Sequence, residues 1–357
     1  MADGGQRQLL PFRYNTRQRE KLISNNLSLA GLGAEGKQQL PRVGLANALL
    51  FTLNATVTLS AAGAFATLGP WSLVNRFRVD LNLGNMNLVD TTGYGMFLLG
   101  KRLARGWGAD GAADWTPTAT AFTAPVALGA NVWKLQWLIP LSANLGSEFD
   151  SGLIVLQAPE IQVDFTVRLA NAGSDFVTNF TSLTGVTFDL DLLYFEVPDP
   201  NFVMLPPGQV VRTVEISKPF AATGLVDYTV ERQGQLMQLI SYIIANGVRT
   251  DGVDFMQLIA NINDTVYQFK PDKLRFLDSF YYSGPQETGT FGLDLWHARE
   301  HPSSGDDRDI IDSEVLTTLQ WQTIVSSGTT LGAGNNFYNT VRRILVNFQQ
   351  PVPGQAI

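Results

Sequence analysis

Apolar and polar residues alternate along several short stretches of the first half of the chain. In residues 49–59, Leu, Phe, Ala and Val side chains fall on one face and Thr and Asn side chains on the other. The same period of two returns at residues 77–83, 161–169 and 186–192. This pattern is typical of strands with one buried and one wet face, and it favours antiparallel sheets.

The second half repeats this pattern. Alternating segments occur at residues 240–244, 256–262, 291–295, 315–325 and 341–348. In the first half, by contrast, residues 133–141 are bulkier and more evenly apolar. Such a run predicts a strand that is buried on both faces.

Only two segments favour helices, residues 92–104 and 270–282. In the second, Pro271 suits the first helical position and Asp272 suits the positive end of the helix dipole. Its apolar stripe consists of Leu274, Leu277 and Tyr281. Each helix follows an alternating strand and a polar turn at a comparable point in its half. The order of elements therefore indicates one plan used twice.

A proline-rich linker separates the halves at residues 197–208, where four prolines remove backbone donors and fix an extended connection. We therefore expect an N-terminal arm at residues 1–39, a first domain at 40–200 and a second at 201–357. Many short strands with Gly and Pro turns predict an all-β protein. The expected architecture is two jelly-roll barrels in tandem, each with a short helix.

Three long connections interrupt the strands at residues 106–130, 299–312 and 326–336. The first is rich in Ala, Gly and Thr, and the other two are polar. Loops of this length are uncommon in compact domains unless they have a function or form an interface. We interpret them as contact loops or exposed loops.

Composition narrows the classes of function. The chain is 45% hydrophobic, which excludes intrinsic disorder, and only 16% charged, against about 25% in typical soluble domains. Its net charge of −7 argues against a protein that packages nucleic acid directly. No cysteine and only two histidines leave little for thiol, metal or general-base chemistry. We expect no enzyme and no cofactor.

Gly31, Gly33 and Gly36 match the spacing of a dinucleotide-binding loop. The surrounding sequence does not, because no clear strand precedes them and Pro41 blocks a following helix. We interpret this segment as a flexible connector.

His297, Glu300 and His301 resemble a zinc-binding arrangement, but Pro302 breaks the helix that it would need. Asp189 and Asp191 share a strand face, as a glycosidase pair would, although simple alternation explains them better. Seven tryptophans offer sugar-stacking surfaces, yet large aromatic residues are more often core or interface anchors. They are Trp71, Trp107, Trp115, Trp133, Trp137, Trp296 and Trp321.

The N-terminus is basic, with Arg7, Arg13, Arg17, Arg19 and Lys21. No apolar segment follows them, so we expect no secretory signal. No run of about 18 uninterrupted apolar residues occurs, so we expect no membrane span. The basic residues indicate either a solvated arm or an arm that touches something anionic.

Several segments, taken in order, resemble tectivirus-like double-jelly-roll major capsid proteins. Leu68-Gly-Pro-Trp-Ser-Leu-Val-Asn-Arg76 leads into a strand and then Thr91-Thr-Gly-Tyr94, similar to the start of that family's first barrel. Leu135-Gln-Trp-Leu-Ile-Pro-Leu-Ser142 resembles its aromatic strand. Further similarity lies at residues 153–169, 186–208 and 270–282, so that the resemblance covers most of residues 40–350. The chain is on the short side for that family.

The resemblance implies a structural protein of the virion, as in tailless bacteriophages with an internal membrane. Three chains of that family form a pseudo-hexagonal homotrimer that tiles an icosahedral shell, and six similar barrels suit this footprint. The implied partners are neighbouring capsomers and minor capsid and vertex proteins. Synthesis and assembly would take place in the host cytoplasm. Sequence-specific nucleic-acid binding is not expected.

In that family the N-terminal segment lies at the inner face of the shell. The resemblance therefore implies that Arg7, Arg13, Arg17, Arg19 and Lys21 contact anionic lipid headgroups of an internal membrane or a minor inner protein.

Two other interpretations remain open. One is a soluble all-β carbohydrate-binding protein or glycosidase, which would be a monomer with exposed tryptophans along a groove. The other is a spike or receptor-binding protein of the virion, which also trimerises. Electron microscopy of assemblies would distinguish them.

Overall fold

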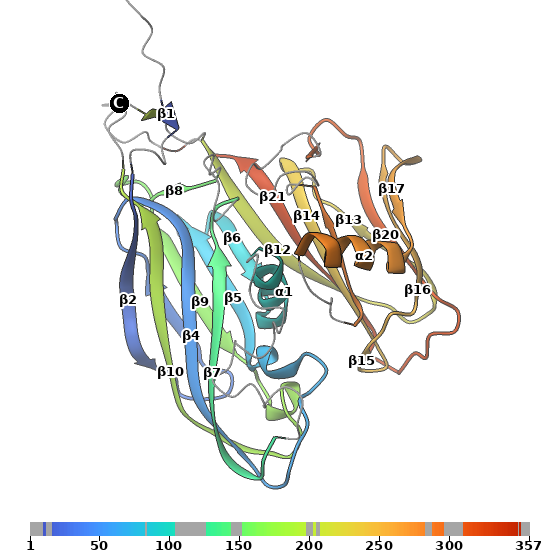
Figure 1. The fold of residues 1–357 in the computed structure, drawn as a ribbon, viewed down its shortest axis with the longest axis horizontal. Helices are drawn as coiled ribbons and strands as arrows, with labels where there is room; N and C mark the ends of the chain where they lie inside the picture. Colours follow the sequence, from blue (N-terminus) through green and yellow to red (C-terminus); the bar gives the residue numbers. More distant parts are fainter. Residues whose placement is uncertain are drawn as a thin grey trace, which may run out of the picture.

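The structure is a computed structural model that describes residues 10–11, 16–82, 84–103, 126–143, 152–197, 203–204, 208–282, 288–295, 310–348 and 350. Strands dominate these residues and form two β-sandwiches that stand side by side (Figure 1). We call residues 16–197 the first roll and residues 208–350 the second roll. Together they form the expected double jelly roll.

The first roll consists of two facing sheets, and all strand pairs within it are antiparallel. One sheet has the order β2 (Gln18–Ser28), β10 (Phe180–Phe195), β4 (Leu45–Leu59) and β7 (Gly129–Pro140), and β8 (Ile154–Val155) also pairs with β4. The facing strands are β6 (Met86–Thr91), β5 (Val74–Leu81), β9 (Val163–Leu169) and β3 (Glu35–Gln39).

An aromatic cluster holds these two sheets together. The fully buried ring of Phe51 on β4 lies 5.1 Å from that of Phe77, 5.8 Å from Trp137, 5.6 Å from Phe165 and 5.4 Å from Phe188. Each such ring pair contributes about 0.5–1.5 kcal/mol beyond the burial of its area. The alternation read from the sequence places these rings, because each occupies an inward position of its strand.

The second roll has the same two-layer plan. One layer contains β12 (Gln209–Pro219), β21 (Phe337–Asn347) and β14 (Gln235–Ala245), with the short strands β15 (Val248–Arg249), β18 (Thr290–Asp294) and β19 (Ile311–Asp312) paired to β14. The other layer has the order β13 (Gly224–Thr229), β20 (Leu319–Val325), β16 (Val253–Ala260) and β17 (Asp264–Phe269).

A single ten-stranded sheet passes through both rolls. It is continuous because β12 pairs in parallel with β6, at Thr213↔Val89 and Val214↔Asp90. A second short parallel pair joins β1 (Leu10–Pro11) to β11 (Val203–Met204). The prediction of antiparallel sheets thus holds within each roll, while the connection between the rolls is parallel.

The strands β14 and β21 are buried on both faces, which corrects the expectation that every alternating strand has a wet face. On β14, Ile240, Tyr242 and Ile244 belong to the hydrophobic cluster of the first roll. Leu239 and Ile243 belong to the cluster of the second roll. The layer that contains β14 therefore separates the two cores and supplies side chains to both.

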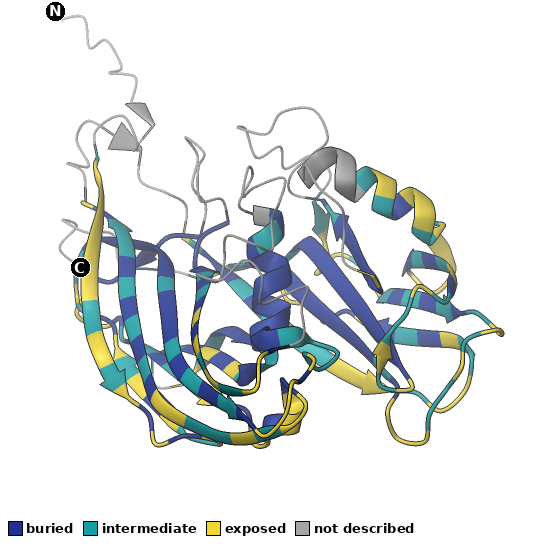
Figure 2. Ribbon diagram, turned by 60° about the horizontal axis from the view of Figure 1, so that its bottom comes forward, coloured by how far each residue is buried: buried dark blue, intermediate teal, exposed yellow. Residues whose placement is uncertain are grey.

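Two helices accompany the rolls at nearly the expected residues. The helix α1 (Gly93–Leu103) lies between the rolls and is almost wholly buried, and α2 (Pro271–Tyr282) covers the second roll with one face exposed (Figure 2). Pro271 opens α2 as predicted, and Leu274 of the predicted stripe is buried. None of the helices in the described residues is long and apolar enough to cross a membrane.

Two expectations need correction. The strand β7 alternates instead of being buried on both faces, since Lys134 is exposed and Gln136 and Leu138 are half-buried between buried neighbours. Residues 18–39, expected within an arm, form β2 and β3, which pair with β10 and β9 of the first roll. Most of residues 106–130, 299–312 and 198–207 lie outside the described part of the chain.

Candidate functional site

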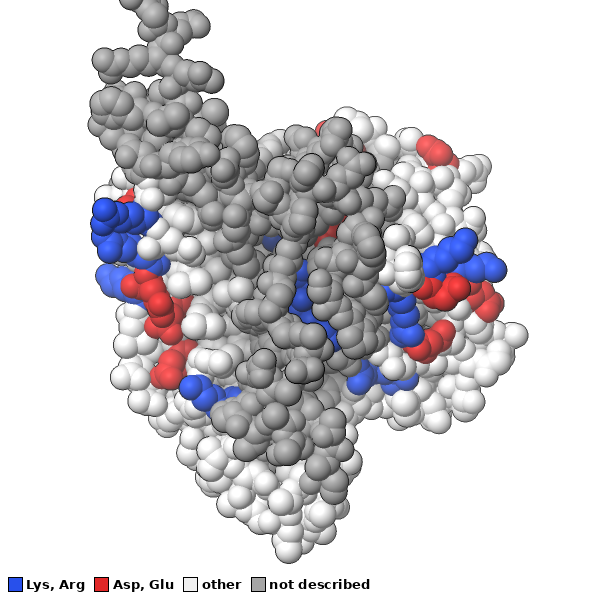
Figure 3. All heavy atoms as spheres, in the orientation of Figure 1, with Lys and Arg blue, Asp and Glu red and all other residues white. Residues whose placement is uncertain are grey.

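Of the basic N-terminal residues, three lie in the described part of the chain. Arg17, Arg19 and Lys21 are exposed at or near the start of β2. Figure 3 shows basic atoms at this edge of the first roll, with acidic atoms beside them. Arg19 Nε donates to Glu196 Oε1 at 2.8 Å, so part of this charge is neutralised. Arg7 and Arg13 lie outside the described residues.

The glycine motif forms a turn and no nucleotide site. Gly31 and Gly33 adopt positive φ angles of 128° and 71° in the connection between β2 and β3. Gly36 lies in β3, where a Cβ atom would stand 2.7 Å from Cε1 of the Phe188 ring. The motif therefore serves a tight turn and a close approach of two sheets, and a strand follows it where a dinucleotide fold needs a helix.

The two carboxylates considered for glycosidase chemistry lie on β10 between its neighbouring strands. Asp189 Oδ1 accepts a hydrogen bond of 2.6 Å from the backbone N–H of Asn26. Removal from water, and the charges of Glu20 and Asp189, raise the pKa of Asp191. Four tryptophans are described and all are buried, so none offers a sugar-stacking face. They are Trp71, Trp133, Trp137 and Trp321.

His297, Glu300 and His301 lie outside the described residues, as do Trp107, Trp115 and Trp296. Within the described part of the chain, no three His, Asp or Glu side chains come together in a way that could hold a metal ion.

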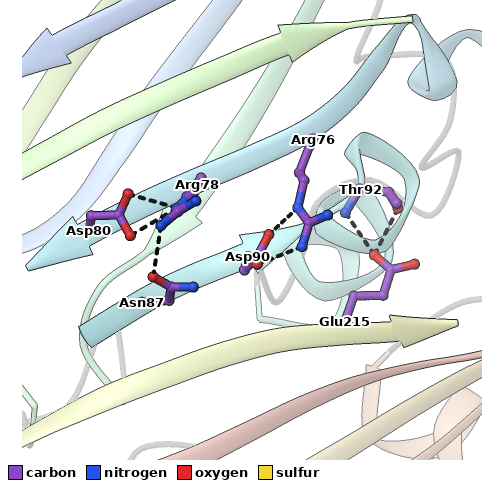
Figure 4. Close-up of polar contacts among 7 residues, drawn as sticks. All are labelled: Arg76, Arg78, Asp80, Asn87, Asp90, Thr92 and Glu215. Carbon is purple, nitrogen blue, oxygen red and sulfur yellow. Dashed lines mark hydrogen bonds and ion pairs between the residues drawn. The ribbon is translucent and has the colours of Figure 1, made fainter. Parts of the chain in front are cut away.

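A polar arrangement lies where β6 of the first roll meets β12 of the second roll (Figure 4). Arg76 on β5 forms a two-pronged ion pair with Asp90 on β6, with Nη2 donating to Oδ2 at 2.6 Å. The hydrogen bond with Asp90, reduced by partial burial, raises the pKa of Arg76. Arg78 on the same strand contacts Asp80 and Asn87, so a row of polar pairs follows the seam.

Glu215 is the second roll's contribution to this junction. Its Oε2 accepts hydrogen bonds of 2.8 Å from both the backbone N–H and the hydroxyl of Thr92, which precedes α1 of the first roll. The Thr92 hydroxyl in turn accepts the N–H of Gly95 at 3.0 Å. A carboxylate from one roll thus occupies the positive end of a helix in the other.

Gly95 makes this approach possible. A Cβ atom at position 95 would stand 2.2 Å from Glu215 Oε2, far inside van der Waals contact. The other carboxylate oxygen, Oε1, accepts a hydrogen bond from the hydroxyl of Tyr242 on β14. Loss of water contact raises the pKa of Glu215, although the hydrogen bonds from Tyr242 and Thr92 and the charge of Arg76 oppose that rise.

Aromatic packing continues the junction. Tyr94 on α1 packs edge-to-face on Tyr242, with ring centroids 5.0 Å apart. Arg249 on β15 donates to the Tyr94 hydroxyl at 2.7 Å and lies over its ring at 5.6 Å. Trp137 Nε1 donates to the carbonyl of Gly93 at 2.9 Å, which fixes the start of α1 against β7.

Buried polar side chains from the second roll also reach the first. Arg343 on β21 is fully buried and donates from Nη2 to the carbonyls of Ser142 at 2.9 Å and Ala143 at 3.2 Å. Burial lowers the pKa of Arg343 to about 10, so it remains charged at neutral pH. Gln350 bonds the backbone N–H of Val155 and the carbonyl of Leu153, both at 2.8 Å.

Sequence reasoning did not find these junction residues. Arg76, Asp90 and Glu215 occupy outward positions of alternating strands, where charged residues are normally solvated. The one local signal lies at residues 92–95, where Thr92 is followed by Gly93 and Gly95 at the start of a helix. Thr is a common N-cap residue, and glycine allows another group to approach the helix closely. Its partner is more than a hundred residues away and gives no local cue.

Comparison with solved structures identifies the same fold in viral capsid proteins. The major capsid protein of Sulfolobus turreted icosahedral virus is 13% identical, with 93% of this chain and 97% of that chain aligned at a TM-score of 0.65. The PBCV-1 capsid protein is 11% identical over 93% and 94% of the two chains, with a TM-score of 0.61.

The major capsid protein of bacteriophage PM2 is 10% identical over 94% of this chain and 99% of that chain, with a TM-score of 0.52. No protein-family model and no curated protein sequence matches the chain. The likeness is one of fold, and it confirms the double jelly roll expected from the resemblance.

The junction predicts an energetic coupling between Gly95 and Glu215. Gly95→Ala should destabilise the protein by about 1–3 kcal/mol, because the new methyl group displaces the carboxylate from its donors. Gly328→Ala is the matched control, since a Cβ there meets nothing within 4 Å. Denaturant unfolding of Gly95→Ala, Glu215→Ala and the double variant should show a strongly non-additive cycle. Additive losses would contradict direct contact.

The raised pKa of Glu215 predicts a pH-dependent junction. A carboxyl group with a raised folded-state pKa binds more protons in the folded state. Its contribution to stability is therefore full below the ordinary value of 4.5 and declines as pH rises through the folded pKa. As the pH rises from 4.5 through the folded-state pKa of Glu215, the wild type should therefore lose stability relative to Glu215→Gln. Unfolding curves at successive pH values measure it, and parallel profiles would contradict the assignment.

Proposed function

We propose that this chain is a major capsid protein, three copies of which form a pseudo-hexagonal tile of an icosahedral virus shell. The observation that carries the proposal is the double jelly roll itself, matched along more than nine-tenths of this chain and of the capsid proteins compared. Its role is structural and non-enzymatic, and its place is the virion. Three-fold association of two similar rolls supplies six similar barrels to one tile.

The exposed strand edges support self-association. Within the described residues β7, β13 and β17 each pair on one side only, so that each presents free backbone groups. Exposed apolar side chains accompany them, with Val132 on β7 at 75%, Leu225 on β13 at 60% and Val266 on β17 at 39% exposure. Bare edges with apolar side chains are liable to pair with other chains, so covering them between copies is favourable.

The burial of the described tryptophans weighs against the carbohydrate-binding alternative. A sugar platform needs an exposed aromatic face, and Trp71, Trp133, Trp137 and Trp321 have none. Asp189 is further engaged by the backbone of Asn26.

Light scattering and electron microscopy of the purified chain test the shell role. We expect a mass of three chains and, on concentration, flat hexagonal tiles or closed shells. Placing Lys at both Val132 and Leu225 should weaken assembly, because it charges two edges that copies would cover. Val315→Lys, at an equally exposed residue outside the strands, should leave assembly unchanged. A chain that stays monomeric at all concentrations would refute the proposal.

We also infer that the basic group at the start of β2 faces the inside of the shell and contacts anionic lipid headgroups of an internal membrane or a minor inner protein. Its members are Arg17, Arg19 and Lys21, together with Arg7 and Arg13 earlier in the chain. Each charge near such a surface contributes about 1 kcal/mol. Neighbouring shell tiles and vertex proteins complete the proposed set of partners.

Vesicle flotation tests this contact. Arg17→Gln with Lys21→Gln should reduce recovery on anionic vesicles several-fold, with the remaining binding lost at high salt. The matched control is Lys37→Gln with Arg168→Gln, which removes two exposed charges from β3 and β9. Deletion of residues 1–24 is a poorer test, because it would remove most of β2 (Gln18–Ser28) and so take away the strand that pairs with β10. Equal, salt-insensitive recovery of all variants would refute the contact.

A further inference from the structure

A groove of about 550 Å³ lies where the two rolls meet at the starts of β6 and β12. The first roll contributes residues 84–87 to its lining. The second roll contributes Arg212, Arg232, Gln233, Glu314 and Val346. The groove is therefore formed by both rolls, and it does not include Glu215 or the other residues drawn in Figure 4 except Asn87.

Two arginines, Arg212 and Arg232, line this groove. Arg212 is held in place: its Nε donates to the carbonyl of Asn87 at 3.1 Å, and its Nη1 contacts Gln233 and Glu231. Arg232 is anchored by one hydrogen bond of 2.7 Å from Nη1 to the carbonyl of Leu316. Among the described residues, no hydrogen bond uses Nη2 of Arg212, or Nε and Nη2 of Arg232. Both guanidinium groups therefore keep donors for a ligand.

A third arginine, Arg342, does not line the groove but is connected to Arg212 through Glu231. It is fully buried, and its Nη2 donates to Glu231 Oε2 at 2.7 Å, the same oxygen that Arg212 contacts at 3.4 Å. Its Nε and Nη1 have no hydrogen-bond partner, and neither has the buried hydroxyl of Tyr228 close by. Burial tends to raise the pKa of Glu231, but the hydrogen bond and charge of Arg342 and the charge of Arg212 lower it overall. Glu231 thus stays ionised between two arginines.

The charges around the groove leave it positive. Three arginines face two glutamates, Glu231 and Glu314, in a chain whose net charge is −7. Guanidinium groups bind tetrahedral oxyanions through paired N–H donors. Glu314 in the lining is an acceptor and repels a fully deprotonated anion. It favours an anion that brings a hydrogen-bond donor of its own, such as the P–OH group of hydrogen phosphate or a hydroxyl group of a phosphate ester.

We propose that this groove is a binding site for a phosphate group, held by Arg212 and Arg232 and ordered by the Glu231–Arg342 pair. The bound group contacts residues of both rolls, so its binding stiffens the connection between them. The site does not depend on the shell role, because its residues all belong to one chain.

Inorganic phosphate is the first probe. At equal ionic strength, phosphate should raise the melting temperature of the protein more than chloride does, and more than sulfate, which offers no donor to Glu314. Titration calorimetry should show that Arg232→Gln weakens phosphate binding about tenfold or more, as expected for the loss of a charged hydrogen bond. Arg168→Gln, which removes an exposed arginine of β9 with one hydrogen bond to Asn171, should bind as the wild type does.

Two further ligands identify the source of the phosphate. Glycerol 3-phosphate in solution represents a free metabolite, and phosphatidylglycerol vesicles represent a lipid headgroup. Binding of either that is lost in Arg232→Gln supports the site and assigns its source. Equal stabilisation by phosphate and sulfate, or equal phosphate affinity of the wild type and Arg232→Gln, would overturn the proposal. Arg212→Gln is a weaker test, because Arg212 also bonds Asn87 across the junction.

Discussion

The structure depends on the burial of one sheet layer from both sides. The strands β14 and β21 give alternate side chains to two different hydrophobic clusters, one in each roll. The core of the first roll is incomplete without the second roll, because Ile240, Tyr242 and Val341 contribute to it from strands of the second roll. Two sandwiches joined only by a linker would move independently. Two sandwiches that share a layer behave as one body.

The polar junction determines how the two bodies fit. The free energy of apolar burial is non-directional and changes little when one roll moves slightly relative to the other. Hydrogen bonds depend on distance and angle, and so they weaken when the rolls move. The carboxylate of Glu215, held by Thr92 and Tyr242, therefore specifies the position of α1 relative to β12 and β14. Buried charges of this kind add little net stability but penalise every alternative arrangement. Arg343 and Gln350 of the second roll also fix its position, because they donate hydrogen bonds to backbone carbonyls next to β7 and β8 of the first roll.

The period-two alternation predicted the fold class and strands such as β4, β9, β10, β14, β16, β20 and β21, because each of these strands follows the alternation separately. It missed other strands, including β2, β12 and β13. Pro271 and Asp272 likewise marked the start of the second helix from local chemistry. Alternation could not predict that both faces of β14 are buried. Tyr242 packs on Tyr94 of α1 only because the first roll lies against this strand, and the local sequence does not specify that position. Glu215 drew no prediction, because residues 209–219 were not recognised as a strand. Residues 18–39 were interpreted as an arm, although β10 and β9 pair with them.

A fixed pair of rolls would suit the proposed tile of three copies. In such a tile one heterologous contact would occur three times, and any bend between the rolls would change the angle of that contact and prevent closure. The shared layer and the Glu215 junction restrict bending between the rolls within each chain. Association of copies would therefore lose less conformational entropy. In the proposed tile, edges such as β7 and β13 would meet neighbouring copies through backbone pairing and apolar side chains. Copies whose rolls are already oriented would not need long-range charge steering, which is consistent with a chain that is only 16% charged.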